Sequence, residues 1–151
     1  MTMSRSFGAV ACVGIVLSAV TACHRDSRPV ATSFELHDAW VRADPDSGST
    51  TAGYIRFVNG TQDTVVVSNF SSDDARVVEL HQTSIDAGGE THMTKLDTLV
   101  IAPSHIVVMR PGGYHFMLIG TTHAFAPGAM IRIAMHLSNG AIVSTSARVK
   151  Q

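Results

Sequence analysis

The sequence predicts an all-β domain, a Greek-key β-sandwich of about nine short strands. Three observations support this class. Segments with alternating apolar and polar residues are short, turn signals separate them roughly every eight to twelve residues, and no segment has the 3.6-residue period of a long amphipathic helix. A chain of 151 residues has the length of one domain.

Turn residues set the boundaries of the expected strands. Residues 44–49 (DPDSGS) indicate a loop, and turns are expected at 59–60 (NG), 111–113 (PGG) and 127–128 (PG). The Asn-Gly pair at 139–140 predicts the tight turn of a last hairpin. The segment 91–99 is expected to be a strand pair or one bent strand. The expected strands are residues 34–43, 52–58, 64–70, 76–83, 91–99, 105–110, 114–119, 129–137 and 141–149.

Residues 1–22 predict a lipoprotein signal peptide. Arg5 gives a positive start, and the apolar run 7–20 is too short to span a membrane comfortably. The run ends in Val-Thr-Ala-Cys, which resembles a bacterial lipobox and predicts cleavage before Cys23 and lipidation of its sulfur. A polar tether to residue 33 and a domain over 34–151 would follow. The alternative is ordinary secretion with cleavage nearby, which leaves Cys23 as a spare thiol.

Composition argues against several classes of function. Charged residues are only 15% and the formal net charge is −1, so the basic excess of a nucleic-acid-binding protein is missing. The chain has two cysteines; Cys12 lies in the signal segment and Cys23 would carry the lipid. A processed domain would then offer no thiolate for redox chemistry, for nucleophilic catalysis, for zinc, or for a blue-copper electron-transfer centre.

The strand expected at 114–119 carries a histidine and a methionine on one face. Alternation puts Tyr114, Phe116 and Leu118 together on the face expected to be buried. His115 and Met117 then share the other face, away from the core. Two such residues at i and i+2 can bind one ion.

Two further residues complete a candidate copper site. Val78 and Leu80 indicate the buried face of the strand at 76–83, so His81 shares the other face with Glu79, which indicates contact with water. Met93 lies near the start of the next segment, after a polar loop. Thioether sulfur binds Cu(I) well and hard cations or zinc poorly, and imidazole suits copper in either oxidation state. These residue types therefore predict a soft-metal site with neutral ligands.

The remaining histidines, methionines and the tryptophan are expected to serve packing or the surface. His92 is a candidate competitor of its neighbour Met93, but adjacent residues on a strand point to opposite faces. All these side chains, and the four candidate ligands as well, could also be incidental in a metal-free domain. The residues assigned to packing or surface are His37, Trp40, His105, Met109, His123, Met130, Met135 and His136.

The order of the four candidate ligands resembles the signature of the PCu(A)C family of periplasmic copper chaperones. Eleven residues separate His81 from Met93, twenty-one separate Met93 from His115, and one separates His115 from Met117. Gln82 stands where the family often has methionine, and no His/Met-rich tail follows residue 149, so one site is expected. The resemblance spans most of residues 34–149, including the segments AWVR (39–42), GYIRFVN (53–59), VELH (78–81), PGGYHFML (111–118) and SNG (138–140).

The resemblance implies a cupredoxin-like β-sandwich that binds one Cu(I) through His81, Met93, His115 and Met117. It implies an extracytoplasmic chaperone, held at the membrane by its lipid anchor. Copper would pass toward the CuA centre of cytochrome c oxidase, with or alongside Sco-type thiol proteins. The alternatives are a copper storage or resistance lipoprotein without a delivery partner, and a metal-free β-sandwich binding module. An enzyme is disfavoured, because no nucleophile–base pair is evident and four ligands leave no open position on the metal.

Overall fold

The computed structural model describes residues 33–151, so the predicted signal peptide and Cys23 lie outside the described part of the chain. Residues 33–151 form an all-β structure of ten strands, which confirms the predicted class. Within this range no helix has the length and hydropathy needed to cross a membrane. The strands are β1 (Phe34–Arg42), β2 (Thr50–Asn59), β3 (Val65–Ser71), β4 (Ala75–Ile85), β5 (Thr91–Leu96), β6 (Leu99–Ile101), β7 (Ile106–Val108), β8 (Tyr114–Thr121), β9 (Met130–Leu137) and β10 (Ile142–Lys150).

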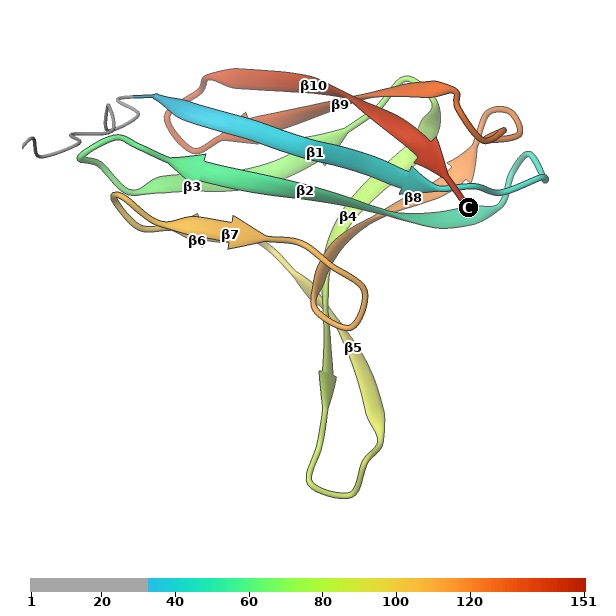
Figure 1. The fold of residues 1–151 in the computed structure, drawn as a ribbon, viewed down its shortest axis with the longest axis horizontal. Helices are drawn as coiled ribbons and strands as arrows, with labels where there is room; N and C mark the ends of the chain where they lie inside the picture. The colour runs from blue at the N-terminus through green and yellow to red at the C-terminus, as the bar shows by residue number, and fades with distance from the viewer. Residues whose placement is uncertain (1–32) are drawn as a thin grey trace, which may run out of the picture.

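The strands form one sheet that closes on itself. Nine strands follow the order β5-β4-β8-β2-β1-β10-β9-β3-β6, and β7 pairs with β2 (Figure 1). A short pairing of β3 with β4, at Phe70 and Val78, closes the run of seven strands from β4 to β3 into a barrel-like sheet. The pair β1–β10 is parallel and every other pair is antiparallel. Closure removes most of the free edges that an open sheet would expose.

The strand boundaries differ from the prediction mainly around one hairpin. The segment 91–99 divides into β5 and β6, which pair with different partners, β4 and β3. Strand β4 continues to Ile85, two residues past its predicted end, because β5 pairs with it over Thr83, Ser84 and Ile85. Backbone pairing between the two arms satisfies these N–H and C=O groups although the side chains are polar or exposed.

The interior of the barrel is apolar. Phe116 and Leu118 are fully buried, as predicted from the alternation in β8, whereas Tyr114 is only half-buried. Gly53 of β2 lies directly opposite Phe116, and a Cβ at this position would be 2.2 Å from the phenyl ring. The glycine therefore makes room for the ring. The largest fully buried side chains are Phe57, Phe116, Phe125, Ile55, Ile101, Leu118, Ile131, Ile133 and Met135.

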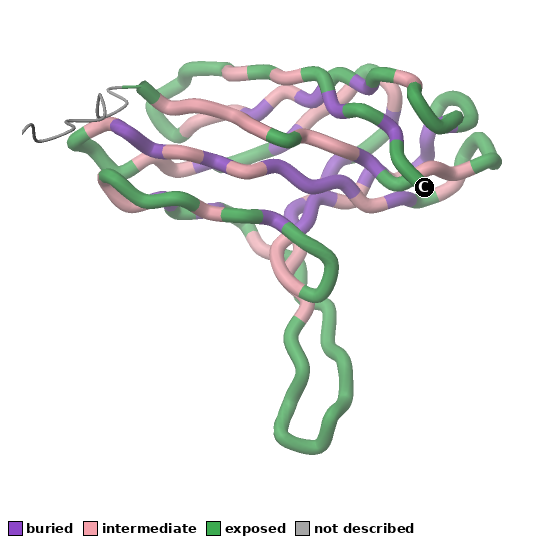
Figure 2. The backbone as a smooth tube through the Cα atoms, in the orientation of Figure 1, coloured by how far each residue is buried: buried purple, intermediate pink, exposed green. Residues whose placement is uncertain are grey.

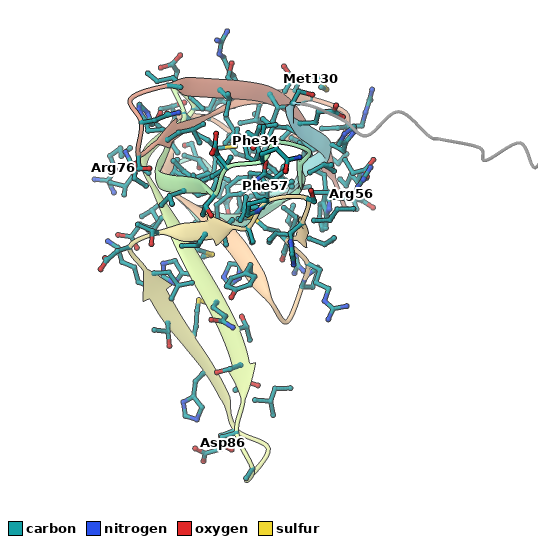
Figure 3. The ribbon with its side chains drawn as sticks, turned by 90° about the vertical axis from the view of Figure 1, so that its left-hand side faces the viewer. Phe34, Arg56, Phe57, Arg76, Asp86 and Met130 are labelled. Atoms are coloured by element: carbon teal, nitrogen blue, oxygen red, sulfur yellow. The ribbon has the colours of Figure 1, made fainter. Side chains whose placement is uncertain are left out.

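Strands β4 and β5 form a hairpin that projects away from the barrel (Figure 1). The pairing runs from Leu80–Leu96 at its root to Ile85–Thr91 near its tip, where Asp86 lies (Figure 3). The β5 arm is exposed from Thr91 to Lys95, and the β4 arm is exposed from Ser84 onward, so the outer part of the hairpin is exposed on both arms (Figure 2). The two candidate histidines lie at the root of this hairpin, and Met93 lies further along its β5 arm.

Candidate metal centre

Strands β4 and β8 bring the two predicted histidine ligands together. His81 lies directly opposite His115 in the antiparallel pair, and their ring centroids are 5.8 Å apart. Glu79, two residues before His81, lies opposite Met117. Directly opposed residues and residues two apart on a strand share a face of the sheet. The register therefore places His81, His115 and Met117 on one face.

Strand β5 adds Met93 to the same face. Met93 lies opposite Thr83, which is two residues after His81 on β4. Its side chain is 56% exposed, on the projecting hairpin. The register thus puts the two histidines at the centre of the site. Met93 lies on the side of Thr83, toward the hairpin tip, and Met117 lies on the side of Glu79, toward the barrel. His92 lies on the other face, as the alternation predicts, and its Nε2 is 2.8 Å from Asp86 Oδ2.

His115 is buried, so the expectation that its face meets water is wrong at this position. It lies on the opposite side of β8 from Phe116, yet is only 4% exposed. The Tyr54 ring lies 6.4 Å from His115 on one side, and the His81 ring lies on the other. Tyr54 is itself stacked on Trp40 at 4.4 Å. This row of rings across four strands covers a face that alternation alone assigns to solvent.

Each of the two imidazoles has one nitrogen in a hydrogen bond. His115 Nδ1 is 3.0 Å from the carbonyl oxygen of Gly113, and His81 Nε2 is 3.1 Å from Glu79 Oε2. His81 Nδ1 is buried and has no hydrogen-bond partner; within residues 33–151 it is the one side-chain nitrogen or oxygen in this situation. A buried polar atom without a partner is costly. His81 Nδ1 is therefore available to bind a ligand.

The Glu79 carboxylate contacts both His81 and the side chain of Lys95. Its Oε1 accepts a hydrogen bond of 2.6 Å from Lys95 Nζ, and Lys95 is the β5 residue directly opposite His81. The hydrogen bond from Lys95, and then that from His81, hold the pKa of Glu79 below its ordinary value. The sequence interpretation used Glu79 only as a sign of solvent and missed this contact. The two-residue spacing from His81 was the available signal, because it puts both side chains on one face.

A second group of potential ligands lies at the tip of the hairpin and contains none of the four predicted residues. Asp86, Glu90 and His92 each offer an atom within 4.8 Å of the others, and all three are exposed. The Asp86 carboxylate already accepts hydrogen bonds from the N–H groups of Gly88 and Glu90. The hydrogen bond from His92 is the main reason why the pKa of Asp86 is low. Hydrogen bonds that stabilise the turn account for this group.

The residues assigned to packing follow the prediction in most cases. Met109 and Met135 are buried, and Met130 is 52% exposed at the start of β9. Trp40 is partly buried against the core, and Lys150 Nζ lies 5.7 Å from its ring. None of these residues lies on β4, β5 or β8, the three strands that carry the candidate ligands.

Comparison with known proteins assigns the chain to a family. Residues 34–149 match the family model described as "Putative lipoprotein LpqE-like". The chain belongs to the LpqE-like family. A curated relative, "Putative lipoprotein Lxx21020" of Leifsonia xyli subsp. xyli (strain CTCB07), is 29% identical over 121 residues, which are 80% of this chain and 71% of the relative.

Solved structures show that this LpqE-like chain has the fold of PCuAC domains. The copper-bound PCuAC domain from PmoF2 is 22% identical, with a TM-score of 0.64, over 82% of this chain and 96% of that domain. The CuI-DR1885 solution structure from Deinococcus radiodurans is 23% identical, with a TM-score of 0.60, over 85% and 83% of the two chains. The apo PCuAC domain from PmoF1 reaches a TM-score of 0.66 at 13% identity, over 82% and 97%. The resemblance found in the sequence is thus confirmed for the fold.

Proposed function

We propose that this LpqE-like chain is an extracytoplasmic Cu(I)-binding metallochaperone. The observation that carries the proposal is the buried, unpartnered Nδ1 of His81, directly across the sheet from His115. The similarity in fold to PCuAC domains, some of them solved with copper, supports it. The protein is proposed to bind and pass on its metal, without catalysing a reaction.

The donor set of the candidate site suits one Cu(I) ion. Two neutral imidazoles and two thioethers, from His81, His115, Met93 and Met117, are soft or borderline ligands and add no charge. The site is asymmetric, because His115 is buried and Met93 is exposed on the hairpin. An acceptor protein would therefore replace Met93 first and His115 last, which gives a stepwise route for transfer.

The destination and the location belong to the same proposal. Copper would be delivered toward the CuA-bearing subunit of cytochrome c oxidase, with or alongside Sco-type thiol proteins. The lipobox ending at Cys23, together with the lipoprotein description of the family, supports a lipid anchor on the outer side of a membrane. The chaperone would then work close to its membrane-bound acceptor.

Two alternatives make different predictions. A storage or resistance lipoprotein would bind Cu(I) equally well but would keep it in the presence of an apo CuA domain. A metal-free binding module would need another binding surface. A groove of about 210 Å³ beside the hairpin root includes Glu79 and Lys95 in its lining but none of the four predicted ligands.

The test is a Cu(I) titration of the full chain in detergent against a chromogenic Cu(I) chelator. We expect one tightly bound equivalent, which the Met93→Ala/Met117→Ala double variant loses. Transfer of that equivalent to an apo CuA domain would then distinguish a chaperone from a storage protein. Failure of the wild-type chain to compete with the chelator would contradict copper binding altogether.

A further inference from the structure

Two Glu-Leu-His segments occur in this chain, and only one lies in the candidate metal centre. Residues 35–37 in β1 and residues 79–81 in β4 have the same sequence. In both, the glutamate Oε2 pairs with the histidine Nε2, at 2.9 Å in β1 and 3.1 Å in β4. The pairing follows from their shared face of a strand. Any special role of the β4 pair must therefore come from its surroundings.

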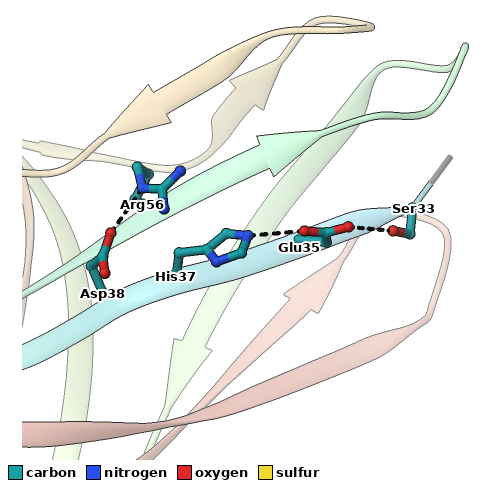
Figure 4. A network of polar contacts seen from close by, with 5 residues as sticks. All are labelled: Ser33, Glu35, His37, Asp38 and Arg56. Carbon is teal, nitrogen blue, oxygen red and sulfur yellow. Dashed lines mark hydrogen bonds and ion pairs between the residues drawn. The ribbon is translucent and has the colours of Figure 1, made fainter. Parts of the chain in front are cut away.

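The second carboxylate oxygen has a different partner in each segment. In β1, Glu35 Oε1 accepts a hydrogen bond of 2.9 Å from the Ser33 hydroxyl (Figure 4). A hydroxyl can turn and act as donor or acceptor. In β4, Glu79 Oε1 faces the Lys95 ammonium at 2.6 Å, which only donates. Lys95 therefore fixes the orientation of the Glu79 carboxylate.

Hydrogen-bond partners give the two site histidines opposite tautomers. A carboxylate accepts, so His81 donates from Nε2, and its neutral ring holds the lone pair on Nδ1. A carbonyl oxygen also accepts, so His115 donates from Nδ1 to Gly113 and holds its lone pair on Nε2. The buried nitrogen without a partner, His81 Nδ1, is the atom that this assignment leaves with a free lone pair.

We propose that Glu79 is a positioning residue of the metal centre, which holds His81 as the Nε2–H tautomer and directs its Nδ1 to the metal, while His115 binds through Nε2. That a metal binds here rests on the proposed function. The two tautomers do not depend on a metal, and the metal-free protein has them as well. A carboxylate hydrogen-bonded to a ligating imidazole fixes the ring and raises its basicity. Lys95 acts one step further out, by holding Glu79.

The Glu79→Gln variant tests the proposal, because Lys95 determines how the new amide must lie. The amide oxygen faces the ammonium, so the NH₂ group faces His81 Nε2 and requires that nitrogen to accept. The proton of the neutral ring then moves to Nδ1. Imidazole ¹⁵N NMR of the metal-free full chain in detergent should show this tautomer switch. Cu(I) affinity, measured against the chelator, should fall about tenfold to a hundredfold.

A rescue and a matched control separate positioning from a general loss of structure. Adding Lys95→Leu to Glu79→Gln frees the amide to turn its oxygen toward His81, and leucine adds no atom that could bind the metal. We expect the Nε2–H tautomer to return, and the Cu(I) affinity to return to that of Lys95→Leu alone. Glu35→Gln changes the other Glu-Leu-His segment, and should leave the His81 tautomer and the Cu(I) affinity unchanged.

The outcomes distinguish this proposal from the proposed function. An Nδ1–H tautomer of His81 in the wild-type chain would overturn the proposal without the need for any variant. Copper binding that is unaffected by Glu79→Gln would overturn it too, and would leave the chaperone proposal intact. A wild-type chain with the assigned tautomers that cannot compete for Cu(I) would instead overturn the proposed function, and the copper part of this proposal with it.

Discussion

His81 and His115 face each other across β4 and β8, at the place where the barrel ends and the hairpin begins. The next pair, Gln82–Tyr114, is the last that these strands form, and beyond it β4 pairs only with β5. The histidine pair thus has the barrel on one side and the exposed hairpin on the other. An ion held there would be anchored on the buried side and open to exchange on the exposed side.

Replacement of His81 should abolish tight Cu(I) binding. His81→Ala removes the one buried side-chain nitrogen that lacks a hydrogen-bond partner in residues 33–151, so we expect a loss beyond the roughly ten- to hundredfold typical of changes outside the ligand shell. The measurement is the chelator competition described above. His37→Ala is the control, because His37 also pairs with a glutamate two residues earlier. Equal losses in the two variants would contradict the site.

Exposed methionines allow a matched test of the thioether ligands. Met93 and Met130 have similar exposure, 56% and 52%, so truncation of either should change stability little. Only Met93 lies beside the histidine pair, because its strand β5 pairs with β4, whereas Met130 lies on β9, which pairs with β10 and β3. We therefore expect Met93→Ala to weaken Cu(I) binding at least about tenfold and Met130→Ala to leave it unchanged. Similar affinities of the two variants would remove Met93 from the ligand set.

The alternation of β8 was enough to predict which residues lie inside the barrel, but not how deeply the opposite face is covered. Phe116 and Leu118 alternate with His115 and Met117 along β8, and both are fully buried. The burial of His115 depends on Tyr54, which is sixty-one positions away in the sequence and comes beside it only through the pairing of β2 with β8. Local periodicity carries no information about such a neighbour.

The surroundings of Glu79 were beyond sequence reasoning for a related reason. Its contact with His81 follows from their spacing on β4. Its contact with Lys95 follows from the register of the β4–β5 hairpin, which pairs His81 with Lys95. That register was not predicted, because the sequence assigned no pairing partner to the strand expected at 91–99. Strand ends that are right to within two residues do not by themselves give the register that brings Lys95 opposite His81.

Gly53 should not tolerate a side chain. A Cβ at this position would lie 2.2 Å from two atoms of the Phe116 ring, which is fully buried and cannot move into solvent. We expect Gly53→Ala to lower the free energy of unfolding by about 1–3 kcal/mol, as overpacking does. Urea denaturation measures this change. Phe116 lies between His115 and Met117 in β8, so the same variant should also weaken Cu(I) binding.

Gly88 provides the control for this substitution. It lies in the turn at the tip of the hairpin, and an added Cβ would be 3.3 Å from one carboxylate oxygen of Asp86. Gly88→Ala should therefore change the free energy of unfolding by less than about 0.5 kcal/mol. If Gly53→Ala proved equally mild, the packing of Phe116 against β2 would have to be looser than the structure indicates.

His123 should titrate above the usual range for histidine. Its Nδ1 lies 3.0 Å from the carbonyl oxygen of Ala124, and its Nε2 lies 3.1 Å from Asp74 Oδ1. Both neighbours accept hydrogen bonds, so both ring nitrogens donate and the imidazolium is favoured. The carbonyl of Ala124, and then Asp74, raise the pKa of His123 above its ordinary value of 6.5. An NMR titration of the His123 ring measures the pKa directly.

The effect on stability has a definite sign. Because the folded-state pKa of His123 is raised, its contribution is complete below pH 6.5 and is lost as pH rises through the folded-state value. Asp74→Asn should lower the pKa of His123 and reduce the stability that is lost between pH 6.5 and the folded-state pKa. Asp73→Asn is the control, because it changes a carboxylate that is not paired with His123, and it should change neither the pKa of His123 nor this loss of stability. If Asp74→Asn left the pKa unchanged, the carbonyl of Ala124 alone would account for the shift, and the ion pair with Asp74 would contribute nothing in solution.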